Sequence, residues 1–442
     1  IVKYKSLVLH VGFSKSDGFI NPWDTALNID SKNKNSIESL RKSYNSEDSN
    51  YYPAPFKPTN PTPTHDLHIC NIKLINGNMY TEDKNDMFGD DTIVEFKYEK
   101  NNLTNWEWVP IRVRYDKTAD YRKTRRNFGN SYKVACSVWR SINFPITKKM
   151  ITGKVKLPTV VDDNEIYYKK KETSENPTES LRHFHNKYVK MLLVKSACKR
   201  KDTLFDMSVG RGGDIYKWVE ADLAFVLGVD VAKDNIHNKA DGVCSRYLKA
   251  KMKYSRVFDG IFMVADATKN FKNGDAFSTP KEVEIMKSLL GTGGKSKELG
   301  LSVYNNYQIA KEGFNVVSNQ FSMHYFFGNL MDVHNFAKNV SQNCKLNGYF
   351  IGTTFDGEKI FNMLKDKEMD DSICLYTEDK YGNQKKVWEV IKKFDKQEFL
   401  DNPSSLGYRI DVYQESINKY FPEYLVNFSY FKRLMELYGF EV

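Results

Sequence analysis

The larger, C-terminal part of the chain alternates short apolar runs with stretches in which apolar residues recur at helical spacing. The short runs predict strands at 203–207, 224–229, 259–264, 314–318 and 347–354. The helical spacing predicts helices at 214–220, 233–250, 329–343 and 357–366, and an amphipathic helix from about Ser174 to Ala197. Strands that alternate with helices are typical of a parallel sheet covered on both faces, so we expect a doubly wound α/β domain over residues 175–442.

The N-terminal part has a different pattern. Three segments, 68–74, 92–98 and 106–114, alternate apolar and polar residues between Asn, Gly and Asp turns. This pattern predicts a small antiparallel β unit, either a barrel or a sandwich. Residues 15–66 are polar and rich in turn residues, and the proline-rich run 53–63 predicts a stiff, extended connector.

Four other segments complete the predicted organisation. A short helix is expected at 128–142 and a linker at 153–163, so residues 1–150 form one domain and residues 151–174 connect it to the next. The polar, Gly/Lys-rich segment 268–311 is expected to be an insertion over one edge of the sheet. Residues 368–420 are expected to be a second, irregular insertion.

Composition and charge narrow the class of protein. With 442 residues, 66 basic and 56 acidic, the net charge is +10, which is compatible with a polyanionic partner. We find no run of about 18 apolar residues, and the start of the chain is no signal peptide, so no membrane contact is expected. The chain does not begin with Met, which predicts a fragment or a processed product.

The six cysteines are scattered along the chain, without a Cys-x-x-Cys pair or a histidine at metal spacing. They are expected to be reduced thiols of a cytosolic protein, and no metal site is predicted.

A glycine-rich turn follows the first strand of the predicted sheet. That strand ends in Asp206, and the segment Val209-Gly-Arg-Gly-Gly-Asp214 leads into the next helix. Glycines let the backbone approach a ligand closely, and a helix N-terminus offers free N–H groups. A dinucleotide loop places a pyrophosphate there, which Asp214 would repel. S-adenosylmethionine carries no phosphate, so the turn favours this cofactor over a dinucleotide. An ordinary strand-to-helix turn is set aside only together with Asp230 and Asp266, which follow.

Three acids end successive predicted strands: Asp206, Asp230 and Asp266. Ligands of a doubly wound sheet bind at the carboxyl ends of its strands. Asp230 is therefore expected to bind the ribose hydroxyls, and Asp266 with Ala267 the adenine edge.

A polar and aromatic cluster follows the fourth strand, from Ser318 to Phe327. Gln320, His324 and Tyr325 are interpreted as functional, since such side chains stack on a base or hydrogen-bond to it. Phe326 and Phe327 are interpreted as aromatics that face the core.

Two further residues allow competing interpretations. Glu423 lies between apolar residues and could accept from guanine N1–H and the N2 amine, although a solvated glutamate is the more common case. The segment Lys239-Ala-Asp-Gly242 has the form of a nucleotidyltransferase motif. It is expected within a helix, where its lysine would point away from the ligand edge.

Taken together, residues 175–440 resemble the mRNA cap (guanine-N7) methyltransferases. The matching segments are Asn186-Lys-Tyr-Val-Lys190, Asp206-Met-Ser-Val-Gly-Arg-Gly-Gly-Asp214, Gly228-Val-Asp230, Ala265-Asp266, Ser318-Asn-Gln-Phe-Ser-Met-His-Tyr325, Gly348-Tyr-Phe-Ile-Gly352 and Pro422-Glu-Tyr-Leu-Val426. The resemblance implies a Rossmann-like fold that binds S-adenosylmethionine.

The resemblance also implies the roles of individual residues. The expected cofactor residues are Lys190, Asp206, Ser208, Gly210, Asp230, Asp266, Ala267 and Gln320. The expected cap residues are Asn186, Arg211, Lys217, Phe321, His324, Tyr325 and Glu423, of which His324, Tyr325 and Glu423 are expected to be catalytic. Two departures stand out: Ser208 replaces the glycine that the family usually has, and the family's final strand is missing after Val442.

The N-terminal part resembles another group of capping enzymes. Arg112-Val-Arg114-Tyr-Asp116-Lys117 is similar to the last motif of RNA guanylyltransferases, which lies in their OB-fold domain, and Lys3-Tyr-Lys5 is weakly similar to the lysine motif before it. The catalytic lysine motif would lie upstream of Ile1. The resemblance therefore implies the C-terminal part of a larger capping enzyme, of the type found in large cytoplasmic DNA viruses.

The implied partners are capped RNA, upstream guanylyltransferase and triphosphatase domains, and a stimulatory capping subunit. The implied location is the cytoplasm, including a viral factory or a virion.

The expected reaction is in-line transfer of a methyl group to guanine N7, without a general base or a metal. Two alternatives stay open. The chain could be an inert module that supports a capping complex, or a 2′-O or other RNA methyltransferase, although the lysine-centred tetrad of 2′-O enzymes is not seen.

Overall fold

The computed structural model describes residues 2–14, 17–30, 33–45, 52–59, 61–125, 129–152, 154, 178–378, 384–415 and 419–441. They form two compact units. The first comprises Ile1–Asn21, Leu40–Asp163 and Asn238–Ala240, and the second comprises Pro22–Ser39, Asn164–His237 and Asp241–Val442. The expected linker at 153–163, except Lys154, and the expected helix start near Ser174 lie outside the described residues.

A five-stranded parallel sheet forms the centre of the second unit. Its strands are β9 (Thr203–Asp206), β10 (Phe225–Asp230), β11 (Asp259–Val264), β12 (Phe314–Gln320) and β13 (Cys344–Thr353), in the order β11-β10-β9-β12-β13. Phe205 of β9 pairs with Leu227 on one side and Val317 on the other. The strand order therefore reverses beside β9, which makes the sheet doubly wound and confirms the predicted fold.

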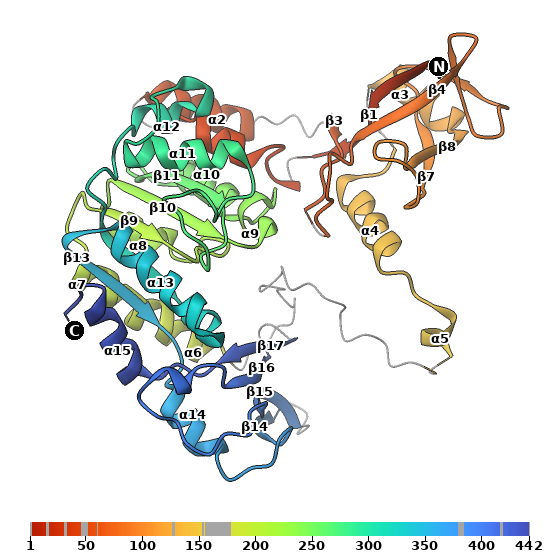
Figure 1. The fold of residues 1–442 in the computed structure, drawn as a ribbon. Coiled ribbons are helices and arrows are strands. Elements are labelled where there is room, and N and C mark those ends of the chain that lie inside the picture. The colour runs from red at the N-terminus through yellow and green to blue at the C-terminus, as the bar shows by residue number, and fades with distance from the viewer. Residues whose placement is uncertain are drawn as a thin grey trace. The chain divides into compact units, whose positions relative to one another are not determined.

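Helices lie on both sides of this sheet (Figure 1). They include α8 (Ile215–Glu220), α9 (Lys233–His237), α10 (Val243–Lys253), α13 (Leu330–Asn343) and α15 (Phe428–Leu437). The helices α6 (Glu179–His183) and α7 (Lys190–Ala197), with the π-helix η2 (Phe184–Val189) between them, precede the sheet, and α14 (Gly357–Leu364) follows it. Because both faces are covered, strand residues such as Leu204, Phe205 and Val226 are fully buried.

The segment 268–311, expected to be an insertion over one edge of the sheet, is partly helical. It contains α11 (Pro280–Leu290), the 3₁₀-helix η3 (Lys297–Leu299) and α12 (Leu301–Asn305), and α12 contacts the edge strand β11. Thr279 is the N-cap of α11, Pro280 is its first residue, and Gly291 is its C-cap with a φ of 76°. Ile285, Met286 and Leu289 belong to the main hydrophobic core, so their burial stabilises the helix against the sheet.

The predicted helix at 233–250 is broken. Residues 238–242 separate α9 from α10, and Lys239 lies in this break rather than within a helix. Its ammonium donates to the Ile20 carbonyl and lies 5.0 Å from the Tyr132 ring centroid, all within the first unit. Lys239 is therefore a packed, buried side chain, as its rejection as a nucleophile requires.

The segment 368–420 is not irregular. Four antiparallel strands form there: β14 (Ser372–Glu378), β15 (Gln384–Lys392), β16 (Arg409–Gln414) and β17 (Lys419–Tyr424). Apolar side chains of this sheet, including Val390, Ile410 and Val412, pack against Ile360 and Phe361 of α14. The sheet brings Glu423 of β17 next to the 3₁₀-helix η4 (Met323–Gly328).

The first unit contains small antiparallel sheets, as the alternating pattern predicted. The sheet β1-β4-β5-β6 is formed by Tyr4–Val8, Ile69–Ile75, Asn78–Tyr80 and Met87–Phe88; β7 (Val94–Tyr98) pairs with β8 (Trp108–Val113), and β2 (His10–Phe13) with β3 (Tyr52–Pro55). The proline-rich run is thus not simply a connector, since it starts within β3 and buries Ala54 and Phe56.

Five helices accompany the first part of the chain: α1 (Pro22–Asn28), α2 (Lys34–Asn45), α3 (Tyr115–Thr124), α4 (Tyr132–Asn143) and α5 (Lys148–Ile151). The helix α4 confirms the one predicted at 128–142. The helix α1 packs in the second unit, where the Trp23 indole N–H donates to the Phe262 carbonyl at 2.7 Å. None of the helices in the described ranges is long and apolar enough to cross a membrane.

Candidate functional site

The glycine-rich turn leaves β9 at the carboxyl edge of the sheet. Gly210 and Gly212 have φ values of 53° and 73°, in the left-handed region that favours glycine. A Cβ on Gly212 would lie 2.7 Å from Ile215 Cδ1 and 2.8 Å from Val243 Cγ2. The two glycines therefore allow the tight turn and the close packing that bring this loop to the sheet edge.

Asp230, at the end of β10, holds the turn in place. Its carboxylate accepts from the backbone N–H of Gly210 at 2.8 Å and of Ala232 at 2.9 Å, and from Asn235 Nδ2 at 3.0 Å. Burial raises the pKa of Asp230, although these donors oppose the shift. The predicted cofactor residues Gly210 and Asp230 thus lie in direct contact.

Asp214 occupies the centre of a buried charge cluster. Its oxygens lie 3.2 Å from Lys190 Nζ and 2.6 Å from Lys217 Nζ, and the Lys217 side chain is 0% exposed. Burial alone would raise the pKa of Asp214, but the two lysines hold it below its ordinary value. Asp214 was not among the predicted site residues, although its position directly after the glycines was the available signal.

Asp206 lies close enough to this cluster to respond to its charge. Burial, and then the charge of Asp214, raises the pKa of Asp206 to about 7. Its Oδ1 accepts from the Ser208 backbone N–H at 3.0 Å. The carboxyl group therefore titrates near neutral pH.

Arg211 and Lys217 are buried rather than open to a phosphate. Arg211 lies 2.6 Å from Asp234 and 2.5 Å from Asp241. Lys217 Nζ lies 3.3 Å from Asn186 Oδ1 in addition to its contact with Asp214. In this structure both predicted phosphate-binding cations are engaged by protein groups.

The end of β12 carries two predicted residues. Gln320 Oε1 accepts from Thr353 Oγ1 at 2.9 Å. Phe321 follows at a φ of 56°, and its ring centroid lies 5.5 Å from Lys190 Nζ and 5.1 Å from the His185 ring. The π-helix η2, which contains Asn186, ends just before Lys190; such helical irregularities are frequent at functional sites.

The loop after β11 is fixed by its own side chains. Asp266 Oδ1 accepts from Thr268 N at 3.0 Å and Thr268 Oγ1 at 2.6 Å, and Ala267 is buried. Asn339 Nδ2 of α13 donates to the Ala267 carbonyl at 3.0 Å. Asp266 therefore stands at the same sheet edge as Asp206 and Asp230, as predicted.

His324 and Glu423 meet in the interior. His324 Nε2 lies 3.6 Å from Glu423 Oε1, and each side chain is 3% exposed. Burial lowers the pKa of His324 to about 3 and raises that of Glu423 to about 8. The Tyr325 ring centroid lies 4.3 Å from that of His324. Glu423 is therefore not a solvated surface residue.

Phe326 and Phe327 face the hydrophobic core, as the sequence interpretation held. Each forms ring contacts there, Phe326 with Phe336 and Phe327 with Phe431. The cluster after β12 thus divides into core aromatics and residues at the site.

The chemistry of this edge fits S-adenosylmethionine. Asp206, Asp214 and Asp230 with Lys190 and Lys217 leave one net negative charge when all are ionised. S-adenosylmethionine has one net positive charge, from a sulfonium, an ammonium and a carboxylate. Among the described residues no cluster of three metal-binding side chains occurs.

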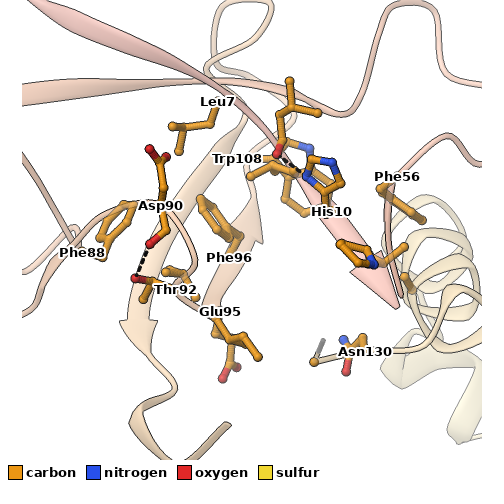
Figure 2. A pocket seen from close by; sticks show the side chains of 18 of the residues that line it. Leu7, His10, Phe56, Phe88, Asp90, Thr92, Glu95, Phe96, Trp108 and Asn130 are labelled. Atoms are coloured by element: carbon orange, nitrogen blue, oxygen red, sulfur yellow. Dashed lines mark hydrogen bonds between the residues drawn. The ribbon is translucent and has the colours of Figure 1, made fainter. Parts of the chain in front are cut away.

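The first unit contains a cavity of about 610 Å³. Side chains of Leu7, Phe56, Phe88, Phe96 and Trp108 line it (Figure 2). None of the predicted cofactor or cap residues is among those that line it. Nearby, on β8 and α3, the guanylyltransferase-like motif forms ion pairs on the surface, Arg112 with Glu95 at 2.7 Å and Arg114 with Asp116 at 3.2 Å.

Comparison with known proteins identifies the family. The mRNA (guanine-N(7))-methyltransferase domain matches residues 161–442. A probable mRNA-capping enzyme of Acanthamoeba polyphaga mimivirus is 27% identical over 390 residues, which cover 83% of this chain and 32% of that protein. An mRNA cap guanine-N(7) methyltransferase of Candida glabrata is 26% identical over 277 residues, which cover 61% of this chain and 55% of that protein.

The chain thus spans about a third of the mimiviral relative and about half of the fungal one. Among solved structures, an S-adenosylmethionine-dependent methyltransferase from Clostridium acetobutylicum is similar at 10% identity and a TM-score of 0.31, over 60% of this chain and 87% of that chain. The fold is established by the strand order itself. Because the matched domain covers most of the chain and contains the whole candidate site, this protein belongs to the mRNA (guanine-N(7))-methyltransferase family.

Proposed function

We propose that this chain transfers a methyl group from S-adenosylmethionine to N7 of the guanine at the 5′ cap of mRNA. The observation that carries the proposal is the buried pair of His324 and Glu423. The rings of Tyr325 and Phe355 lie against His324. Ser322, just before η4, contacts Ser208 of the cofactor loop. A buried carboxylate next to aromatic rings suits a flat base with N–H donors.

The cofactor residues divide by the group that each would bind. Asp230 would accept from the ribose hydroxyls, and Asp266 with Ala267 would border the adenine. Lys190 would bind the carboxylate, and Asp206 the ammonium. The backbone of Ser208 and Gly210 and the side chain of Gln320 would line the remaining surface. The arrangement of these residues around one edge of the sheet supports these roles.

The proposed cap residues centre on Glu423 and on the residues that follow β12. Glu423 would accept from guanine N1–H and the N2 amine, while Phe321, His324 and Tyr325 would border the base. Asn186 would contact the cap sugar or phosphates. Arg211 and Lys217 contribute by fixing the glycine turn and Asp214, since their charges are already paired within the protein.

The mechanism depends on orientation. The cofactor supplies a methyl group on a sulfonium. Guanine N7 has a free lone pair, so no residue is required to remove a proton. The protein holds the guanine so that N7 faces the methyl group, which is the main source of rate. Glu423 on the guanine edge stabilises the positive charge that develops on the base as the methyl group arrives.

Guanine specificity tests this proposal. RNA capped with GpppA should accept a labelled methyl group, whereas RNA capped with ApppA should accept none, because adenine presents no N1–H to Glu423. Equal labelling of both RNAs would contradict the assignment of Glu423 to the guanine edge.

The first 150 residues are proposed to be the OB-fold-like C-terminal part of a guanylyltransferase, with residues 151–174 as a linker and 175–442 as the methyltransferase. The similarity to the mimiviral capping enzyme covers 390 residues, more than the 282 residues that match the methyltransferase domain. This wider similarity supports a capping-enzyme origin for the first 150 residues. From the same similarity we propose that the chain is part of the capping enzyme of a large cytoplasmic DNA virus. Its proposed partners are upstream capping domains and a stimulatory subunit. Its proposed location is a viral factory or a virion.

A further inference from the structure

A closed ring of hydrogen bonds joins the cofactor turn to the helix that carries the cap residues. Ser208 Oγ lies 2.5 Å from Ser322 Oγ. Asn319 Nδ2 lies 3.2 Å from Ser208 Oγ, and Asn319 Oδ1 lies 3.0 Å from Ser322 Oγ. Ser208 of the cofactor turn thus meets two residues at the junction of β12 and η4.

The single Ser322 proton can go to Ser208 Oγ or to Asn319 Oδ1 but not to both. With the Asn319 amide oriented as in the structure, one arrangement of hydrogens therefore satisfies all three contacts. The Asn319 amide donates to Ser208, the Ser208 hydroxyl donates to Ser322, and the Ser322 hydroxyl donates back to Asn319. Each hydroxyl then donates once and accepts once, and such rings of hydrogen bonds strengthen one another. Asn319 is 0% exposed, so it provides a fixed base for the two serines.

Ser208 is connected to the proposed cofactor site, and Ser322 is connected to the proposed cap site. The Ser208 backbone N–H donates to Asp206, and Ser208 lies two residues before Gly210, so it moves with the cofactor turn. Ser322 directly precedes η4, and its carbonyl accepts from the Tyr325 backbone N–H at 3.1 Å. A shift of Ser322 would therefore displace His324 and Tyr325.

We propose that the Ser208–Asn319–Ser322 ring couples cofactor binding to the position of η4, so that a bound cofactor favours cap binding. The three residues are positioning residues, because they act on the substrate through His324 and Tyr325. This deepens the proposed function and rests on it for the identity of the two ligands. Since linkage is reciprocal, the cap strengthens cofactor binding by the same factor.

The Ser208 hydroxyl is the point at which the cofactor turn joins the ring. Ser208→Gly removes this hydroxyl together with Cβ, and Ser208→Ala removes it with the least change in shape. Ser208→Thr keeps the hydroxyl.

Hydrogen–deuterium exchange of residues 323–328 tests the coupling, with S-adenosylmethionine as the probe. In the unmodified chain, saturation with S-adenosylmethionine should slow exchange in η4 by about fivefold or more. Ser208→Ala and Ser322→Ala should reduce this protection to nearly none, while Ser208→Thr retains it. Ser137→Ala, an exposed serine of the first unit, is the matched control and should behave as the unmodified chain.

A second measurement follows the ligands themselves. The Kd of GpppA should fall by about fivefold or more on saturation with S-adenosylmethionine, and this factor should approach one in the two alanine variants. In Ser322→Ala, which lies outside the proposed cofactor residues, the melting temperature and the Kd of S-adenosylmethionine alone should change little. This separates coupling from a general loss of structure.

The two failures are distinguishable. Equal protection of η4 in the unmodified chain and both alanine variants would overturn the coupling, even if the product is methylated at N7. Protection that depends on both serines, with no methyl group at guanine N7, would support the coupling and overturn the proposed function instead.

Discussion

His324 Nε2 lies 3.6 Å from Glu423 Oε1 in a place where each side chain is 3% exposed. Within the described part of the chain, neither His324 Nε2 nor Glu423 Oε2 has a hydrogen-bond partner. Burial holds the histidine neutral, with a pKa of about 3, and raises the pKa of the glutamic acid to about 8. Because unpartnered buried groups are costly, their presence side by side indicates a site that a ligand completes.

Glu423 should therefore lower the stability of the free protein at high pH. A carboxyl whose pKa rises on folding contributes stability that is fully present below its unfolded value, near 4.5, and is lost as the pH rises through about 8. Glu423→Gln removes this loss. Thermal denaturation should show a melting temperature about 5 °C higher for the variant at pH 8 and little difference at pH 4.5. An equal shift at both pH values would contradict the raised pKa.

Cap binding should depend on pH in the same range. A guanine edge that donates two hydrogen bonds favours ionised Glu423, so binding must release its proton below pH 8. The affinity for GpppA, measured without cofactor, should rise about tenfold per pH unit from 6 towards 8 and then level off. His324 stays neutral throughout this range. A flat profile in the unmodified chain would exclude Glu423 as the guanine ligand, whereas Glu423→Gln should be flat and weak.

Asp230→Asn tests the cofactor assignment. The amide keeps the size of the side chain but lacks the negative charge that accepts from Gly210 N–H and from the ribose. A charged hydrogen bond of this kind contributes about 2 kcal/mol, so the Kd of S-adenosylmethionine should rise about 30-fold in titration calorimetry. Asp222→Asn, which alters an acid paired with Lys201 near the surface, is the control. Unchanged affinity in Asp230→Asn would exclude its role at the ribose.

Asp214→Asn tests the buried charge cluster. The substitution leaves Lys217, which is 0% exposed, without its carboxylate at 2.6 Å. Removal of one partner from a buried ion pair costs about 3–5 kcal/mol, which urea denaturation should show as a lower free energy of unfolding. Glu220→Gln breaks the half-exposed pair with Lys195 and should cost less than about 1 kcal/mol. Equal effects of the two variants would mean that Lys217 finds another partner.

The central sheet could be predicted because its strands are continuous apolar runs between glycine and helical segments. Each observed strand lies within a few residues of its predicted range. Asp206 and Asp230 end strands as expected, whereas Asp266 lies two residues after β11 ends at Val264. The sheet β14–β17 was missed although its residues alternate, as in Arg409–Gln414. Lysines and tyrosines occur on both faces of these strands, so the alternation of apolar and polar residues is weak in the sequence.

The sequence predicted which residues lie near the site better than it predicted their charge partners and burial. Lys217 is buried against Asp214, and Arg211 pairs with both Asp234 and Asp241. These contacts depend on the positions of the three acids in the folded chain, which the local sequence does not reveal. The ring at Ser208 likewise requires a residue more than 100 positions away. Charge and hydroxyl partners are set by tertiary packing, and these were the features that sequence alone could not supply.

The position of the transferred methyl group tests the account most directly. The chain would be incubated with labelled S-adenosylmethionine and GpppA-capped RNA, and the RNA would be digested with nuclease to release the cap. The account predicts label in m7GpppA, and loss of that label in Glu423→Ala. Label on a ribose hydroxyl, or label at N7 that persists in Glu423→Ala, would contradict it.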